Sequence, residues 1–324
     1  MSASAVRLLA VAALGAAALA GCGATSDEAL RTSLAALRTP APAAATTPPL
    51  PSRPCSDLTA SLRPSGSLPA PGHMPAGSTM AAIARHGTLV AGVDQNTLLL
   101  SYRNPINGQL EGFEIDLLRE VARAIFGDPD RIEFKAVSTA DQRIRAAQSG
   151  RVDVVADAVT ITCDRRAQVA FSTVYYHAVQ RVLVPKTSHA RSIADLAGKR
   201  VCATGGTTTI KRLKRLPEPV IAFPVAQRTD CLVDLQEGVV DAISSDDAIL
   251  LGYKAQDPYT KVIGAAIADE PYGMAMSRTH PDLVRFVNGV LARMRADGRW
   301  AAIYRRWFGR YQPTPAPPRA RYSD

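Results

Sequence analysis

Two segments of the chain repeat one pattern, and this repetition constrains the fold more than any other feature of the sequence. Residues 148–158 read QSGRVDVVADA and residues 236–246 read QEGVVDAISSD. In each segment a glycine ends a helical stretch, and Val-Asp then leads into a run of residues typical of a buried strand. The repeat predicts two similar halves, each with its own strands and helices.

Strand and helix patterns alternate around both copies of the repeat. The first half contains strand patterns over 87–94 and 132–137, and between them a helix over 111–127 with apolar residues along one face. The second half contains a strand over 199–204 and a Gly-Thr turn that opens a helix over 205–216. This alternation predicts two open α/β lobes, each a mainly parallel sheet flanked by helices. Such sheets bind ligands outside the carboxyl ends of their strands.

The N-terminal residues lie outside the alternating pattern. Arg7 and the apolar run LLAVAALGAAALA have the form of a secretory leader that is too short to span a membrane. The residues LAGC that end at Cys22 resemble the lipobox of bacterial lipoproteins, which implies cleavage before Cys22 and lipid on its thiol. We predict a signal peptide over 1–21 and a lipid-anchored, Pro/Ala-rich tether over 22–80. An ordinary signal peptide with a chance cysteine is the alternative.

These features predict a protein outside the cytoplasm, anchored by lipid to the outer face of the bacterial cell membrane. The C-terminal residues 312–324 repeat the proline-rich composition and are predicted to be a disordered tail. About 230 residues remain for the folded part, which is enough for two lobes of ordinary size.

The net charge of +9 does not indicate a nucleic-acid partner. The basic residues are dispersed and aromatic residues do not alternate with them, so we expect no nucleic acid to bind. We interpret the most basic run, KRLKRL at 211–216, as a solvated helix face beside an anionic membrane. The histidines show no metal-ligand spacing, and we expect no metal and no cofactor. They are His73, His86, His177, His189 and His280.

Four cysteines remain after Cys22 is assigned to lipid, and an exported protein usually oxidises its cysteines. Four cysteines allow three pairings. We favour Cys202 with Cys231, which lie close together in one half, and this leaves Cys55 with Cys163. Four free buried thiols are the alternative.

Three loops at predicted strand ends carry polar groups that suit the two ends of a free amino acid. A guanidinium can bind both oxygens of a carboxylate, backbone N–H groups at a helix start favour an anion, and a rigid acid suits an ammonium. Taken singly, the same residues are ordinary turns, caps and surface side chains. They are Thr160 and Arg165 in the first loop, Gly205, Gly206, Thr207 and Thr208 in the second, and Asp246 and Asp247 in the third.

The segment GQLEGFEIDLLREVARAI resembles the signature of the family 3 extracellular solute-binding proteins, the polar-amino-acid receptors of ABC importers. VTITCDRRAQVAFSTVYY, GKRVCATGGTTT and GVVDAISSDDAILLGY are similar to three further segments of that family, and they occur in the family's order. The resemblance spans about 84–310. It implies a two-lobed, type II periplasmic-binding-protein-like fold with the ligand in the interlobe cleft. We place lobe 1 at 81–184 plus 273–311 and lobe 2 at 185–272.

The resemblance also implies roles for individual residues. Arg165 matches the arginine that binds the α-carboxylate, and Asp246 matches the acid that binds the α-ammonium. The Gly-Thr-Thr turn and Arg143 are most similar to the aspartate/glutamate receptors, in which an arginine at that place meets the side-chain carboxylate. The complete expected ligand-binding set is Asp94, Arg143, Thr160, Arg165, Gly206, Thr207, Thr208 and Asp246.

The expected function is therefore extracytoplasmic binding of glutamate or aspartate by closure of the lobes, and delivery of the ligand to an ABC permease. We expect a monomer. The same closure could instead signal through a membrane sensor protein to a regulatory kinase, and the sequence does not separate the two functions.

Two residues depart from the family's usual pattern. They are Cys163 and Asp157, and an unpaired Asp157 would disfavour a ligand carboxylate, which keeps asparagine among the candidate ligands. We expect no catalytic residues and no enzyme activity, because no nucleophile pair stands at the strand ends. Glu270, near the predicted hinge, is the one candidate buried acid to which no role is assigned.

Overall fold

The computed structural model describes residues 56–323. The first of its two large sheets has the strand order β5-β1-β6-β13-β7. Every residue of its central strand, β1 (Leu89–Val93), is buried. β5 (Ile132–Ala136) and β6 (Val154–Val155) pair with β1 in parallel. β13 (Ala275–Met276) and β7 (Ala170–Phe171) complete the sheet in the antiparallel sense.

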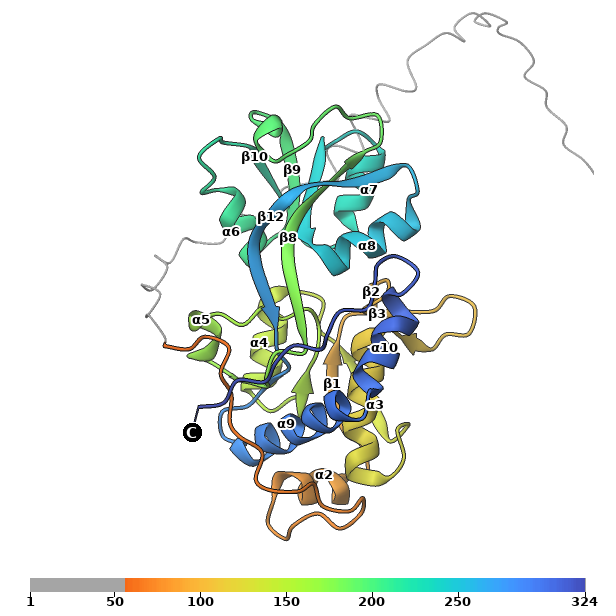
Figure 1. Ribbon diagram of the computed structural model, residues 1–324, viewed down its shortest axis with the longest axis vertical. Coiled ribbons are helices and arrows are strands. Elements are labelled where there is room, and N and C mark those ends of the chain that lie inside the picture. Colours follow the sequence, from red (N-terminus) through yellow and green to blue (C-terminus); the bar gives the residue numbers. More distant parts are fainter. Residues whose placement is uncertain (1–55, 324) are drawn as a thin grey trace, which may run out of the picture. The chain divides into compact units, whose positions relative to one another are not determined.

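The helices of the first lobe cover this sheet (Figure 1). α3 (Phe113–Phe126) begins after Gly112, whose φ of 141° and whose approach to the Leu100 carbonyl leave no room for a side chain. The ring of Phe113 then packs against rings of α10 (Arg299–Phe308), which follows α9 (Pro281–Ala296). The C-terminal helices therefore return to the first lobe.

The second large sheet has the strand order β10-β9-β11-β8-β12. β10 (Ile221–Val225), β9 (Arg200–Thr204) and β11 (Ala242–Asp246) are parallel, whereas β8 (Tyr176–Pro185) and β12 (Thr260–Tyr272) run antiparallel to their neighbours. Both sheets are thus mixed. In each of them four of the five strands run in the same direction, which confirms the expectation of mainly parallel sheets. The lobe boundaries stay a proposal. Because β8 belongs to the second sheet, the first crossing is better placed just before Tyr176 than at residue 184.

The shorter elements lie around these two sheets. The strands β2, β3 and β4 form a small antiparallel sheet next to α3. The bounds are α2 (Thr79–His86), β2 (Asn96–Thr97), β3 (Ser101–Arg103), β4 (Leu110–Glu111), α4 (Ala140–Gln148), α5 (Cys163–Arg166), the 3₁₀ turn η1 (Ala194–Leu196), α6 (Thr208–Leu213), α7 (Asp230–Gln236) and α8 (Asp247–Gln256). Within residues 56–323 no helix is both long and apolar enough to cross a bilayer.

A disulfide joins Cys202 on β9 to Cys231 on α7, the pairing that we favoured from the sequence. Cys163 is also in a disulfide. Its predicted partner, Cys55, lies outside the described residues, as do Cys22 and the predicted signal peptide. Residues 56–323 belong to one compact unit, which contains all three apolar clusters of the described residues.

The two ends of the described chain pack on the first lobe, which corrects the prediction of a tether up to residue 80 and a disordered tail. Ser61 pairs with Tyr322 in an isolated parallel bridge, and its hydroxyl donates to the Phe171 carbonyl at 2.6 Å. The buried side chain of Asn288 donates to Ser61 Oγ and to the Leu62 carbonyl, both at 2.7 Å. Extended proline-rich segments keep backbone carbonyls free to accept such bonds, which composition alone does not reveal.

Candidate functional site

The first of the three predicted loops is held rigidly at the junction of the lobes. Thr160 forms an isolated bridge with Tyr272 at the end of β12, and the hydroxyl of Thr162 caps α5 by accepting from the Arg165 N–H at 3.2 Å. Arg165 Nη1 donates to the Thr160 carbonyl at 2.7 Å. Burial, assisted by Arg143, lowers the pKa of Arg165 to about 10. Arg165 therefore remains a cation at neutral pH, in a fixed orientation.

The second loop uses its two threonines differently. Thr207 caps α6: its hydroxyl accepts from the Ile210 N–H at 3.3 Å and donates to the Thr204 carbonyl at 2.7 Å. Thr208 instead donates its hydroxyl to Glu270 Oε2 at 2.7 Å. The hydroxyl of Thr207 is thus committed to the helix, which leaves Thr208 as the hydroxyl that faces the other lobe.

The third loop carries Asp246 at the end of β11, with a side chain that is 5% exposed. Its Oδ2 accepts from the Tyr272 hydroxyl at 2.6 Å, and its Oδ1 is buried without a hydrogen-bond partner among the described residues. The same holds for Oε1 of Glu270. Burial, and next the charge of Glu270, raise the pKa of Asp246 to about 7. Two buried acceptors therefore lack a donor at this place.

Two hollows show which of these predicted residues come together. One, of about 620 Å³, is lined by Thr160, Thr208 and Glu270 among others. The adjacent one, of about 300 Å³, is lined by Arg165, Gly206 and again Thr208. Each hollow takes residues from both lobes. Four members of the expected set therefore lie at one cleft between the lobes, and Asp246 is buried next to Glu270 and Tyr272.

Arg143 and Asp94 instead belong to a buried ionic network, in which Asp157 is the central acid. Asp157 is fully buried, and its Oδ2 forms an ion pair with Arg143 Nε at 2.6 Å. Asp94 uses both oxygens within the protein, one for the N–H groups that follow it and the other for the Thr97 hydroxyl at 2.7 Å. Arg143 Nη2 is buried and has no hydrogen-bond partner among the described residues.

Arg228 completes this network, and no sequence pattern indicated it as a site residue. It lies between β10 and α7 in the second lobe, yet its Nη1 meets Asp157 Oδ1 at 2.7 Å, the Thr97 hydroxyl at 2.9 Å and Asp94 Oδ2 at 3.3 Å, all in the first lobe. Its side chain is 5% exposed. A buried acid in an apolar strand requires a cation, so Asp157 was the signal that could have predicted such a partner. The sequence does not indicate which cation takes that place.

Glu114, at the start of α3, holds the backbone of the chain that leads into the first loop. Its Oε1 accepts from the Ala158 N–H at 2.7 Å and from the Tyr175 hydroxyl. Burial, and next the charge of Asp157, raise the pKa of Glu114 to about 7. Glu114 therefore fixes the backbone two residues before Thr160 and does not itself line either hollow. Among residues 56–323 no three His, Cys, Asp or Glu side chains are grouped as metal ligands.

The chain is similar to known proteins over most of its length. The model of the bacterial extracellular solute-binding proteins, family 3, matches residues 89–310. The ABC transporter glutamine-binding protein GlnH of Bacillus subtilis (strain 168) is 34% identical over 230 residues, which cover 71% of this chain and 84% of that protein. A glutamate/aspartate import solute-binding protein of Salmonella typhimurium is 27% identical over 255 residues, covering 75% and 82%. Among solved structures, an ancestral arginine-binding protein bound to glutamine has 34% identity and a TM-score of 0.63, covering 69% of this chain and 98% of that one.

Proposed function

The chain belongs to the bacterial extracellular solute-binding proteins of family 3, and on that premise we propose that it binds one polar amino acid, preferably glutamate or aspartate, between its lobes. The observation that carries the proposal is the set of buried polar atoms without partners in the described residues. Asp246 Oδ1 and Glu270 Oε1 are acceptors that await a donor, and Arg143 Nη2 is a donor that awaits an acceptor. An amino acid supplies an ammonium to the first two and an oxygen to the third.

The two ends of the ligand are assigned as follows. Its α-carboxylate binds Arg165, because a planar guanidinium holds both oxygens at once. The Thr160 hydroxyl is a further donor. Thr208 contributes through its backbone N–H at the start of α6, because its hydroxyl donates to Glu270. Its ammonium binds Asp246 with help from Glu270. The support for this assignment is the arrangement around the two hollows, where Arg165, Thr160 and Glu270 meet across the two lobes. Asp246 is buried next to Glu270. Closure of the lobes excludes water from the charged pairs and strengthens them.

The side chain of the ligand is directed toward Arg143 and Arg228. Two guanidiniums face Asp157 there, and Asp94 adds a second acid. The pairing of Asp157 removes the objection that an unpaired acid would repel a ligand carboxylate. It also lowers the local positive charge, so we expect the preference for a carboxylate over an amide to rest on the donors of Arg143.

We further propose the setting in which binding takes place. The family consists of extracellular receptors, and the lipobox-like residues around Cys22 support anchoring to the outer face of the membrane. The similar glutamine-binding and glutamate/aspartate-binding proteins are named as parts of import systems, which supports delivery of the amino acid to an ABC permease. The family is one of binding proteins and not of enzymes, as the sequence analysis expected.

Titration calorimetry of residues 52–324 with glutamate and with glutamine tests the proposal. Glutamate is expected to bind more tightly, and Arg143→Met to weaken glutamate by about 10-fold or more, as for a lost hydrogen bond to a charged group. Arg151→Met, at an exposed arginine of the same lobe that lines neither hollow, is the control and should change neither affinity. Tighter binding of glutamine would overturn the acidic preference, and absence of binding by both would count against the assigned site.

A further inference from the structure

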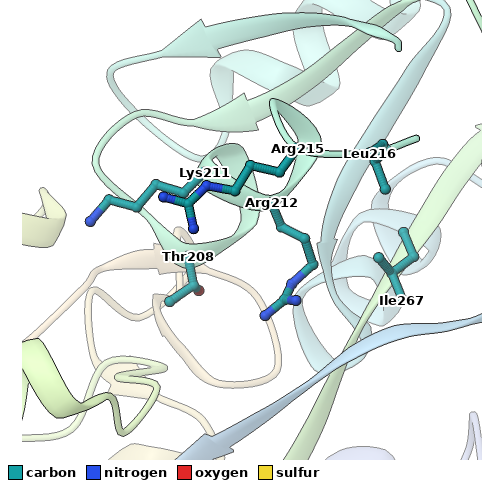
Figure 2. A pocket seen from close by; sticks show the side chains of 6 residues that line it. All are labelled: Thr208, Lys211, Arg212, Arg215, Leu216 and Ile267. Carbon is teal, nitrogen blue, oxygen red and sulfur yellow. The ribbon is translucent and has the colours of Figure 1, made fainter. Parts of the chain in front are cut away.

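A concave basic surface lies on the second lobe, next to the residues assigned to the amino acid, and shares Thr208 with them. It is a hollow of about 350 Å³ next to α6, and Figure 2 shows its lining side chains. Three of the six lining residues are cations and two are apolar, and none is acidic. We call this surface the α6 basic groove; it is lined by Thr208, Lys211, Arg212, Arg215, Leu216 and Ile267.

The cations of the groove are exposed and unneutralised. Lys211, Arg212, Lys214 and Arg215 lie within five consecutive residues, and each is exposed. Within residues 56–323 no carboxylate forms an ion pair with any of them. Glu218, the nearest acid along the chain, does not line the groove. Like charges so closely spaced repel one another, and an anionic surface would relieve that repulsion.

The first described residues of the chain lie close to the groove. Arg212 also lines the 620 Å³ hollow, together with Leu58 and Thr59. Arg166 Nη1 holds the carbonyl of Leu58 at 3.0 Å, so the first described residues are fixed beside the groove. About 33 residues separate this point from Cys22. A chain of that length spans about 30 Å when flexible and about 100 Å when extended as polyproline II.

We propose that the α6 basic groove binds the phosphate groups of anionic phospholipids in the membrane. The cations of the groove meet the phosphate of one lipid and those of its neighbours, and Leu216 and Ile267 supply apolar contact area beside them. Such contact turns the side of the domain that bears the cleft mouth toward the membrane. Electrostatic attraction adds to lipid anchoring, because a single lipid chain holds a protein only weakly.

The test is co-sedimentation of the unlipidated unit, residues 52–324, with lipid vesicles. Binding is expected to vesicles that contain phosphatidylglycerol, to fall at high salt, and to be absent with phosphatidylcholine alone. The variant K211Q/R212Q/K214Q/R215Q should bind at least about 100-fold more weakly, since each cation near an anionic surface contributes roughly fivefold.

A charge-matched control distinguishes binding by the groove from attraction due to the net charge of +9. R85Q/R151Q/R305Q/R310Q removes four exposed cations from the first lobe and should bind vesicles as the wild type does. Glutamate-induced thermal stabilisation is measured for both variants, so that a failure of amino acid binding is distinguished from a failure of membrane binding. If the groove variant does not fold, K214Q/R215Q replaces it, with an expected loss of about 25-fold.

Three results would overturn the proposal. They are absence of binding to phosphatidylglycerol vesicles, equal loss of binding in the groove and control variants, and complete displacement by free glycerol phosphate. The last would identify a soluble phosphate as the ligand in place of a membrane surface.

Discussion

Asp246 is expected to lose its proton when the ammonium of an amino acid binds to it. Its pKa is raised to about 7 from an ordinary value of 3.8. Because the folded-state pKa lies above the unfolded one, Asp246 contributes stability that is fully present below about pH 4 and is lost as the pH rises through 7. A bound ammonium favours the ionised acid, so the ligand and the proton compete for Asp246.

This competition predicts that glutamate binding releases close to one proton at pH 6, and that affinity rises with pH up to about 7. Calorimetry in two buffers with different ionisation enthalpies measures the proton directly. Glu114→Gln removes the other buried acid whose pKa lies near 7 and should leave the release unchanged. Binding without proton release at pH 6 would show that Asp246 does not receive the ammonium.

Arg165 is the second residue on which the site depends. Arg165→Ala should weaken glutamate binding by at least about 2 kcal/mol, near 30-fold, because it leaves the ligand carboxylate without its charged donor. Arg151→Ala, at an exposed arginine that lines neither hollow, is the matched control. Equal affinities of the wild type and Arg165→Ala would refute the assignment.

Individual residues were predictable from sequence to different degrees. Thr160, Thr208 and Asp246 stand at strand ends, where the alternating pattern already places ligands. Arg228 escaped because its acid partner Asp157 is 71 residues away in the chain and in the other lobe. No local pattern records a contact of that range. The sequence also could not show that the Thr207 hydroxyl caps α6, because threonine serves equally as a helix cap and as a ligand donor.

At the scale of elements, the disulfide ties β9 to α7 within the second lobe. It closes a separation of 29 residues between β9 and α7. C202A/C231A should lower the free energy of unfolding by about 3 to 4 kcal/mol, the entropy of a loop of that length. Denaturant unfolding of both proteins measures the difference. Repeating it after thiol reduction isolates the contribution of the remaining cysteines, and an unchanged midpoint in C202A/C231A would contradict the prediction.

The elements themselves followed the sequence where apolar periodicity was strong, as in β1 and α3. The strand expected after Gly150 is only two residues long, β6, and Ala158 departs from the extended conformation with a φ of 47°. The hydrophobicity pattern of a sequence cannot predict that an alanine adopts a positive φ. The prediction of a tether up to residue 80 was wrong for a related reason. Asn288 binds the backbone carbonyl of Leu62, and no pattern of side chains in the sequence predicts a contact with backbone.

At the scale of the whole molecule, the lobes meet where α8 approaches the backbone of Leu98. A Cβ on Gly252 would lie 2.5 Å from the Leu98 carbonyl oxygen. Gly252→Ala should therefore oppose closure and weaken glutamate binding by about tenfold, given the usual cost of overpacking. Lys254→Ala, an exposed change on the same helix, should have no effect. Unaltered affinity in Gly252→Ala would mean that closure does not use this contact.

The most direct test of the central claim is thermal unfolding of residues 52–324 in the presence of each of the twenty amino acids. A ligand at 100 times its dissociation constant adds about 2.7 kcal/mol of stability. We predict that glutamate or aspartate gives the largest rise in melting temperature and that Arg165→Ala abolishes it. A rise with a different amino acid alone would keep the receptor and reject the acidic preference. No rise with any amino acid would contradict the account.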